Sequence, residues 1–99
     1  MVIKKVAAAG TLESSDARVV VEPSPDGIEL EISSSVAQQF LRQIRQTVSE
    51  TLARLEVSNA KIKVEDRGAL DCTLKARVEC AVFRAAEFDG KVNWGGSVR

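Results

Sequence analysis

The sequence predicts an α+β domain in which a small three-stranded sheet, antiparallel or mixed, packs against two helices in the order β-β-α-β-α. Three observations predict this class. Short segments rich in β-branched residues, or alternating between apolar and polar residues, are typical of strands. Two longer segments repeat apolar residues every three or four positions, as amphipathic helices do. The length of 99 residues suits one hydrophobic core, expected over residues 1–88, with residues 89–99 as a loosely ordered tail.

Two strands are expected before the first helix, over residues 17–22 and 28–33. The first contains the β-branched run Val19-Val20-Val21, and the second alternates isoleucine or leucine with glutamate or serine. Residues 23–27 read Pro-Ser-Pro-Asp-Gly, a composition typical of a turn. We therefore expect these two strands to pair as a hairpin. The preceding residues, 1–12, are weakly patterned and are expected to form an extended lead-in.

The longest helix is expected from about Ser35 to Leu55. Ser35 and Gln38 have the spacing of a capping box, which marks the start of a helix. An apolar stripe recurs every four residues and consists of Val36, Phe40, Ile44, Val48 and Leu52. This stripe should lie across the sheet.

A third strand and a second helix follow. Residues 60–66 alternate between apolar and polar residues, and the pair Arg67-Gly68 ends that strand. Asp71 is placed to cap the second helix, whose solvated face would carry Arg77 and Arg84. Its buried face is expected to consist of Leu74, Val78, Ala81, Val82 and Ala85.

The charge balance bears on the partners of the chain. Fourteen basic and fourteen acidic side chains give a formal net charge of zero. Because no strong field of one sign results, neither nucleic acid nor an anionic membrane surface is expected as a partner. The sequence also lacks the apolar run of about 20 residues that a membrane-spanning helix requires, so a cytoplasmic location is expected.

The residue types that are absent bear on catalysis. The chain has no histidine and no tyrosine, which often transfer protons near neutral pH. No catalytic residue and no metal site are therefore expected, and the chain is expected to be a non-catalytic module. Cys72 and Cys80 lie eight positions apart without a metal-binding spacing, and they are expected to be buried apolar fillers that form no disulfide.

One segment combines features of a modification site. In Gly10-Thr11-Leu12-Glu13-Ser14-Ser15-Asp16, a serine stands between two acidic residues in an expected loop, where another protein could reach it. Serine and aspartate in turns more often bond only to their own backbone. The residue types alone therefore do not define a site.

The same segment resembles the N-terminal attachment motif of the acyl carrier subunit of citrate lyase. The resemblance continues in Ile32-Ser33-Ser34-Ser35-Val36 with Gln39-Phe40, which is similar to that family's entry into its long helix. It also includes Asp66-Arg67-Gly68-Ala69-Leu70-Asp71-Cys72 and Leu74-Lys75-Ala76-Arg77-Val78-Glu79, which are similar to the family's C-terminal block. It spans residues from about 7 to 86 with matching spacing.

The resemblance implies a covalent cofactor. In that family a serine, here Ser14, bears 2'-(5''-phosphoribosyl)-3'-dephospho-CoA through a phosphodiester, and Ser15 is the fallback position. The arm ends in a thiol that holds acetyl and citryl thioesters while citrate is cleaved to acetate and oxaloacetate. Glu13 and Asp16 would help the modifying enzyme to recognise the loop. Glycine often follows the modified serine in this family, whereas Ser15 stands there in this sequence.

The resemblance also implies partners. Two of them are subunits of the lyase: the alpha subunit, which is an acyl transferase, and the beta subunit, which is a citryl lyase. The third is the holo-acyl-carrier-protein synthase or transferase that attaches the arm. The carrier would raise the local concentration of substrate at two active sites by tethering it.

Two alternatives stay open. The related acyl carrier subunit of malonate decarboxylase resembles this family in using the same arm. An unmodified adaptor, with a helix face as its docking surface, is the alternative from another class of protein.

Overall fold

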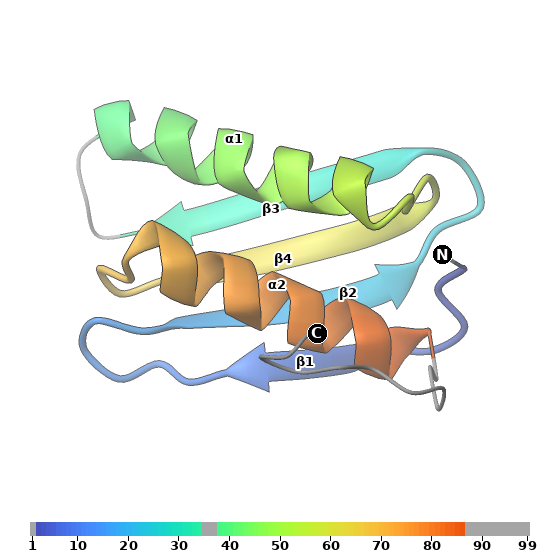
Figure 1. Cartoon of the computed structure of the whole chain (residues 1–99), viewed down its shortest axis with the longest axis horizontal. Helices are drawn as coiled ribbons and strands as arrows, with labels where there is room; N and C mark the ends of the chain where they lie inside the picture. The colour runs from blue at the N-terminus through green and yellow to red at the C-terminus, as the bar shows by residue number, and fades with distance from the viewer. Residues whose placement is uncertain (1, 35–37, 87–99) are drawn as a thin grey trace.

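A computed structural model describes residues 2–34 and 38–86 of the chain. The elements in order are β1 (Ala7–Gly10), β2 (Ala17–Pro23), β3 (Ile28–Ser34), α1 (Gln38–Arg54), β4 (Ala60–Asp66) and α2 (Asp71–Ala85) (Figure 1). The expected tail over residues 89–99 and the capping residue Ser35 lie outside the described residues.

The α+β class is confirmed, but the sheet has four strands where three were expected. The additional strand is β1, which lies within the segment expected to be an extended lead-in. It pairs antiparallel with β2, from Ala7 opposite Val21 to Gly10 opposite Arg18. The true hairpin of the fold is therefore β1–β2.

The expected pairing of β2 with β3 is wrong, because β4 lies between them in the sheet order β1-β2-β4-β3. Strand β4 pairs antiparallel with β2 and parallel with β3. A parallel pair needs a long crossover, and α1 supplies it between β3 and β4. At the start of β4 the Gly27 amide donates to Asn59 Oδ1 over 2.8 Å, and the Ala60 amide donates to Gly27 O over 3.0 Å.

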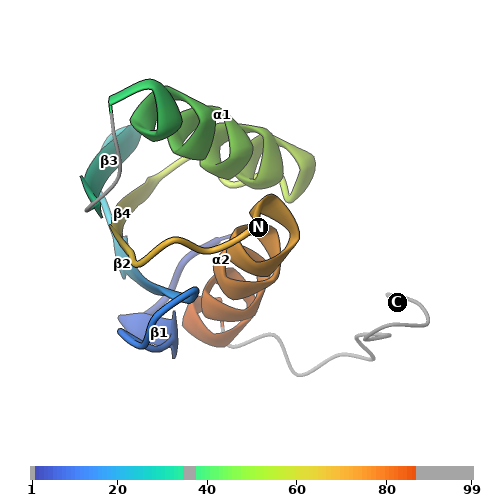
Figure 2. The ribbon, with the colours of Figure 1, turned by 90° about the vertical axis from the view of Figure 1, so that its left-hand side faces the viewer.

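Both helices cover the same face of the sheet, and the other face is uncovered in the described part of the chain (Figure 2). The core between the two layers is made largely of valine, isoleucine and leucine. All five apolar residues expected on the buried face of α2 are buried. In the stripe expected on α1, Ile44, Val48 and Leu52 are buried, but Phe40 is 49% exposed.

The start of α2 differs from the expected one. Leu70, not Asp71, is the N-cap residue of α2, and it makes no side-chain capping hydrogen bond. Asp71 is the first residue of the helix and accepts a hydrogen bond from Gln43 Nε2 over 2.8 Å.

Cys72 is exposed and Cys80 is half-buried, so the expectation of buried fillers is wrong for Cys72, and neither forms a disulfide.

Helix α1 ends in a left-handed turn at Glu56, whose φ is 58°. The Val57 amide donates to Leu52 O, and the Glu56 amide donates to Ala53 O, which is the bonding pattern of a Schellman motif. Among the described residues, no helix combines the length and the apolar character needed to cross a bilayer. The cytoplasmic location stays a prediction.

Candidate functional site

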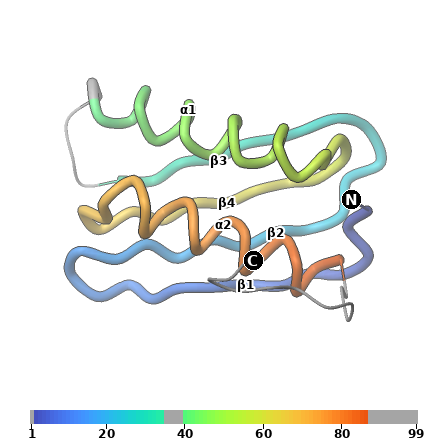
Figure 3. The backbone as a smooth tube through the Cα atoms, viewed as in Figure 1, coloured from blue at the N-terminus to red at the C-terminus, as the bar shows by residue number. Residues whose placement is uncertain are grey.

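The serine singled out in the sequence lies in the connection between β1 and β2. This connection, residues 11–16, is at the same end of the molecule as the connection between β4 and α2 (Figure 3). Ser14 and Ser15 are both exposed. The hairpin thus presents both candidate hydroxyls to solvent.

A tight turn places Ser14 at the tip of this connection. The Asp16 amide donates to Glu13 O over 3.2 Å, so Ser14 and Ser15 are the two central residues of the turn. Ser15 has a φ of 66°, in the left-handed region, whereas Ser14 has a negative φ. A positive φ at the third position alone is typical of a type II turn, which favours glycine there. Glycine would therefore suit the position that Ser15 occupies.

The two serines differ in how the backbone holds them. The Ser15 amide donates to Arg67 O over 2.8 Å, and the Arg67 amide donates to Asp16 O over 2.9 Å. These bonds extend the β2–β4 pairing beyond the pair Ala17 and Asp66. Within the described part of the chain, the Ser14 hydroxyl makes no hydrogen bond. Ser14 is therefore a free hydroxyl on a fixed support.

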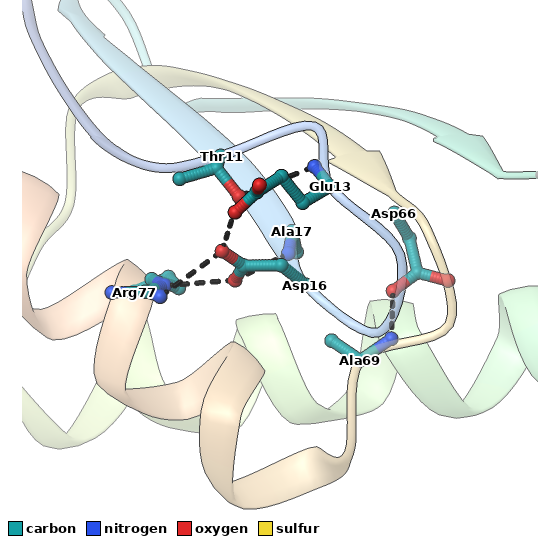
Figure 4. A network of polar contacts seen from close by, with 7 residues as sticks. All are labelled: Thr11, Glu13, Asp16, Ala17, Asp66, Ala69 and Arg77. Atoms are coloured by element: carbon teal, nitrogen blue, oxygen red, sulfur yellow. Dashed lines mark hydrogen bonds and ion pairs between the residues drawn. The ribbon is translucent and has the colours of Figure 1, made fainter.

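Asp16 is the centre of the polar contacts that hold the loop (Figure 4). Its carboxylate accepts hydrogen bonds from the Thr11 hydroxyl over 2.6 Å and from the Ala17 amide over 2.7 Å. It also accepts two from the Arg77 guanidinium of α2, over 2.9 and 3.1 Å. The Thr11 hydroxyl oxygen in turn accepts a hydrogen bond from the Glu13 amide over 3.2 Å. Both ends of the loop are thereby joined to one helix.

These contacts set the protonation of Asp16. The hydrogen bonds from Arg77 hold the pKa of the Asp16 carboxyl well below its ordinary value, and those from Thr11 and the Ala17 amide lower this pKa further. The same pair raises the pKa of Arg77. Asp16 is therefore ionised throughout the physiological pH range, with its charge directed at α2.

Arg77 and Arg84, the two arginines of α2, have different partners. Arg84 is exposed, as expected, although its guanidinium donates to Ala8 O of β1 over 2.7 Å. Arg77 was expected on the solvated face; its side chain is 38% exposed, but its guanidinium is bonded to Asp16 instead of being free in solvent. The Arg77 stem also lies against β1, since a Cβ added to Gly10 would be 3.1 Å from Arg77 Cδ.

Asp66 shapes the neighbouring connection between β4 and α2. Its side chain is buried, and its carboxylate accepts hydrogen bonds from the Ser34 hydroxyl and from the amides of Gly68 and Ala69, over 2.9, 3.1 and 3.0 Å. This turn carries the Arg67 carbonyl that binds the Ser15 amide. A buried carboxylate thus supports the loop of residues 11–16 from the side of β4.

Sequence reasoning singled out the exposed residues of this loop but missed its supports, Asp66, Arg67 and Arg77. No local pattern could have found Arg77, because 61 residues separate it from Asp16. Thr11 also supports the loop, because its hydroxyl bonds both the Asp16 carboxylate and the Glu13 amide. In residues 2–34 and 38–86, no group of three or more histidine, cysteine or acidic side chains could hold a metal ion.

Comparison with a family model and with solved structures indicates the class of protein to which this chain is similar. Residues 4–85 match the family model for ACP, which is described as malonate decarboxylase delta subunit (MdcD). A solved structure, the Pseudomonas malonate decarboxylase hetero-tetramer in complex with malonate, contains a chain with the same fold. That chain matches with a TM-score of 0.66 and 22% identity over 83% of this chain and 84% of its own length.

Curated relatives narrow the class. A citrate lyase acyl carrier protein of Haemophilus influenzae is 55% identical over 94 residues, which are 95% of this chain and 96% of that protein. The protein of the same name from Fusobacterium nucleatum is 57% identical over 88% of this chain and 94% of its own length. The citrate lyase acyl carrier protein of Streptococcus uberis is 49% identical over 95% of this chain and 92% of its own length. The chain belongs to the citrate lyase acyl carrier protein family.

Proposed function

We propose that this chain is the acyl carrier subunit of citrate lyase and that Ser14 bears 2'-(5''-phosphoribosyl)-3'-dephospho-CoA through a phosphodiester. One observation supports this more than any other. The Ser14 hydroxyl is exposed at the tip of a turn that Asp16, Arg67 and Arg77 hold in place.

The residues of the loop fit a bulky covalent group. An arm on Ser14 would extend from the tip into solvent, so that no buried side chain needs to move. Ser15 is the poorer site, because its amide is bound to Arg67 O and its left-handed φ is already unfavourable for a residue with a Cβ. The proposal therefore assigns the arm to Ser14, with Ser15 as the fallback.

When attached, the arm supplies a thiol that carries acetyl and citryl thioesters. The contribution of this chain is to hold the attachment oxygen at a defined place and to keep the surrounding loop from folding over it. The chemistry would belong to the partners, the alpha subunit as acyl transferase and the beta subunit as citryl lyase. Tethering would supply each of them with substrate at an effective concentration of about millimolar.

Recognition by the modifying synthase or transferase would use the exposed side of the loop. Glu13 is exposed, which leaves its carboxylate accessible to that enzyme. The Asp16 side chain is only 13% exposed and is bound by Arg77. We therefore assign direct recognition to Glu13, and to Asp16 a contribution through the shape of the loop.

The test is the intact mass of the protein produced together with its native modifying enzyme, followed by peptide mapping. An adduct with the mass of phosphoribosyl dephospho-CoA is expected on Ser14. Ser14→Ala should remove the adduct and change the free energy of unfolding by no more than about 0.5 kcal/mol, as expected for an exposed loop hydroxyl. Ser15→Ala is the matched control and should keep the adduct. An unmodified wild-type chain would instead favour the adaptor.

A second candidate is the carrier subunit of malonate decarboxylase. It is favoured by the description of the matching family model and by the fold shared with the Pseudomonas complex. Reconstitution separates the two candidates. The modified chain should restore citrate cleavage to citrate lyase alpha and beta subunits, and should fail to restore malonate decarboxylation to the corresponding subunits of that enzyme.

A further inference from the structure

A groove lies beside the attachment loop, between the first turns of α1 and the connection from β4 to α2. Its volume is about 380 Å³. Its apolar lining is formed by Phe40 and Ile44 of α1 and by Ala69 and Leu70 of the connection. None of these residues has a role in the function proposed above.

Three exposed large apolar side chains lie at this end of the molecule. Six large apolar side chains are exposed in the part of the chain that the structure describes. Two of them form the edges of the groove, Phe40 at 49% and Leu70 at 70% exposure, and Leu12 of the attachment loop is 44% exposed. Apolar side chains gathered around a groove are typical of a surface that binds a ligand.

The walls of the groove are held in place without a ligand. Asp66 fixes the turn by accepting hydrogen bonds from the Gly68 and Ala69 amides. Ile44, at 6% exposure, belongs to the core. A groove with fixed walls binds at a lower cost in conformational entropy than a groove that must form first.

The polar groups of the groove indicate the chemistry of its ligand. Asp71 and Gln43 lie at its edge, bonded to each other over 2.8 Å, and Asp66 lies in its wall. Carboxylates accept hydrogen bonds and repel phosphate. The groove therefore suits an uncharged, flexible chain that combines apolar segments with N–H donors.

The attachment loop is next to this groove. The Ser15 amide is bonded to Arg67 O, and the residue after Arg67, Gly68, already lines the groove. A group tethered to Ser14 would thus begin beside the groove and experience an effective concentration of about millimolar there.

We propose that the groove binds the pantetheine segment of the arm on Ser14, an uncharged chain with two amide groups. This rests on the function proposed above. The phosphates of the arm would remain near Ser14, away from Asp66 and Asp71. With a dissociation constant of about 1 mM, the groove would be occupied about half of the time, so that docking would protect the thiol without trapping it.

The experiment uses protein that intact mass shows to be fully modified, compared with the unmodified chain by ¹⁵N amide spectra. Attachment should shift the amides of Ile44, Ala69 and Leu70 in addition to those of residues 11–16. Leu70→Asp should abolish the shifts of the amides that line the groove (the groove shifts), whereas Val6→Asp should leave these shifts unchanged. Val6 is the matched control, because it is 59% exposed and precedes β1, at the strand end away from the loop.

A second readout is the alkylation rate of the arm thiol, separated from Cys72 and Cys80 by peptide mapping. Leu70→Asp should raise this rate about twofold, the reciprocal of the free fraction in the wild type. In fully modified protein, shifts confined to residues 11–16 with an unchanged rate would overturn the groove proposal and leave the carrier function intact. Groove shifts caused only by adding alpha or beta subunits to the unmodified chain would assign the groove to a partner and overturn it too.

Discussion

The Asp16 carboxylate and the Arg77 guanidinium form a two-point contact, with Nε to Oδ1 at 2.9 Å and Nη2 to Oδ2 at 3.1 Å. The contact joins the loop that carries Ser14 to the second helix across 61 residues of sequence. A planar guanidinium that meets both oxygens of a carboxylate fixes orientation as well as distance. The position of the proposed attachment site therefore depends on α2 as much as on its own hairpin.

Arg77→Lys should slow attachment of the arm without preventing folding. Lysine keeps the positive charge but cannot make the two-point contact, so the loop would sample other conformations. If the competent loop geometry falls to about a fifth of the population, the apparent KM of the modifying enzyme for this chain rises about fivefold, with kcat little changed. Initial rates of adduct formation over a range of carrier concentrations measure both constants.

Arg84→Lys is the control for this prediction. Arg84 lies on the same helix but donates to Ala8 O of β1, outside the loop. It should leave the KM for modification unchanged. An equal rise in KM for both variants would show that α2 acts only through general stability.

The contribution of Asp16 to stability should depend on pH in a defined direction. The folded-state pKa of Asp16 is held well below its unfolded value of about 3.9. The stabilisation is therefore fully present above the unfolded pKa and is lost as the pH falls toward the folded pKa. The difference in unfolding free energy between wild type and Asp16→Asn should be constant from about pH 8 to 5 and shrink below about pH 4. Urea titrations at each pH would measure it, and a difference that does not change with pH contradicts the assignment.

Gly10→Ala should be strongly destabilising. Gly10 has a φ of 93°, and a Cβ there would lie 1.8 Å from Ala17 O, where backbone cannot yield without breaking the β1–β2 pairing. We expect a loss of about 3 kcal/mol or more in the free energy of unfolding, or no folding at all. Gly27 and Gly68 also have positive φ but have no atom within 4 Å of such a Cβ. Alanine at either control position should cost only about 1 to 2 kcal/mol, from the backbone conformation alone.

Local patterns were sufficient to predict part of the fold. Strand β4 was predicted with the bounds that the structure shows, because residues 60–65 alternate between apolar and polar side chains, and the apolar ones, Ala60, Ile62 and Val64, are buried. Strand β1 was missed because Ala7–Gly10 consists of small residues without alternation, and it becomes a strand only by pairing with β2. The false β2–β3 hairpin arose because a short turn usually joins neighbouring strands. Here the crossover through α1 inserts β4 between them.

The candidate site was likewise predicted only in part from the sequence. Ser14, Glu13 and Asp16 could be singled out because they lie within one segment of seven residues that resembles a family motif. Arg77 could not, because its pairing with Asp16 exists only once the helix has packed on the sheet. The groove was missed for the same reason, since Phe40 was assigned to the buried stripe of α1 by its period and is instead half exposed.

Ser15→Gly should stabilise the protein and keep the arm. Ser15 has a φ of 66°, which costs a residue with a Cβ about 1 to 2 kcal/mol, whereas glycine loses only about 0.5 to 1 kcal/mol more conformational entropy on folding. The expected net gain is about 0.5 to 1 kcal/mol in the free energy of unfolding, measured by chemical denaturation. Glu56→Gly, at the left-handed end of α1, should relieve the same backbone cost far from the attachment loop.

The two glycine variants also separate the two serines. Both should be modified to the same extent as the wild type, as measured by intact mass, because Ser14 is unchanged in each. Since Ser15→Gly keeps the turn and removes only its second hydroxyl, loss of the adduct in this variant alone would move the arm to Ser15. A retained adduct, combined with its absence in Ser14→Ala, would leave Ser14 as the attachment residue.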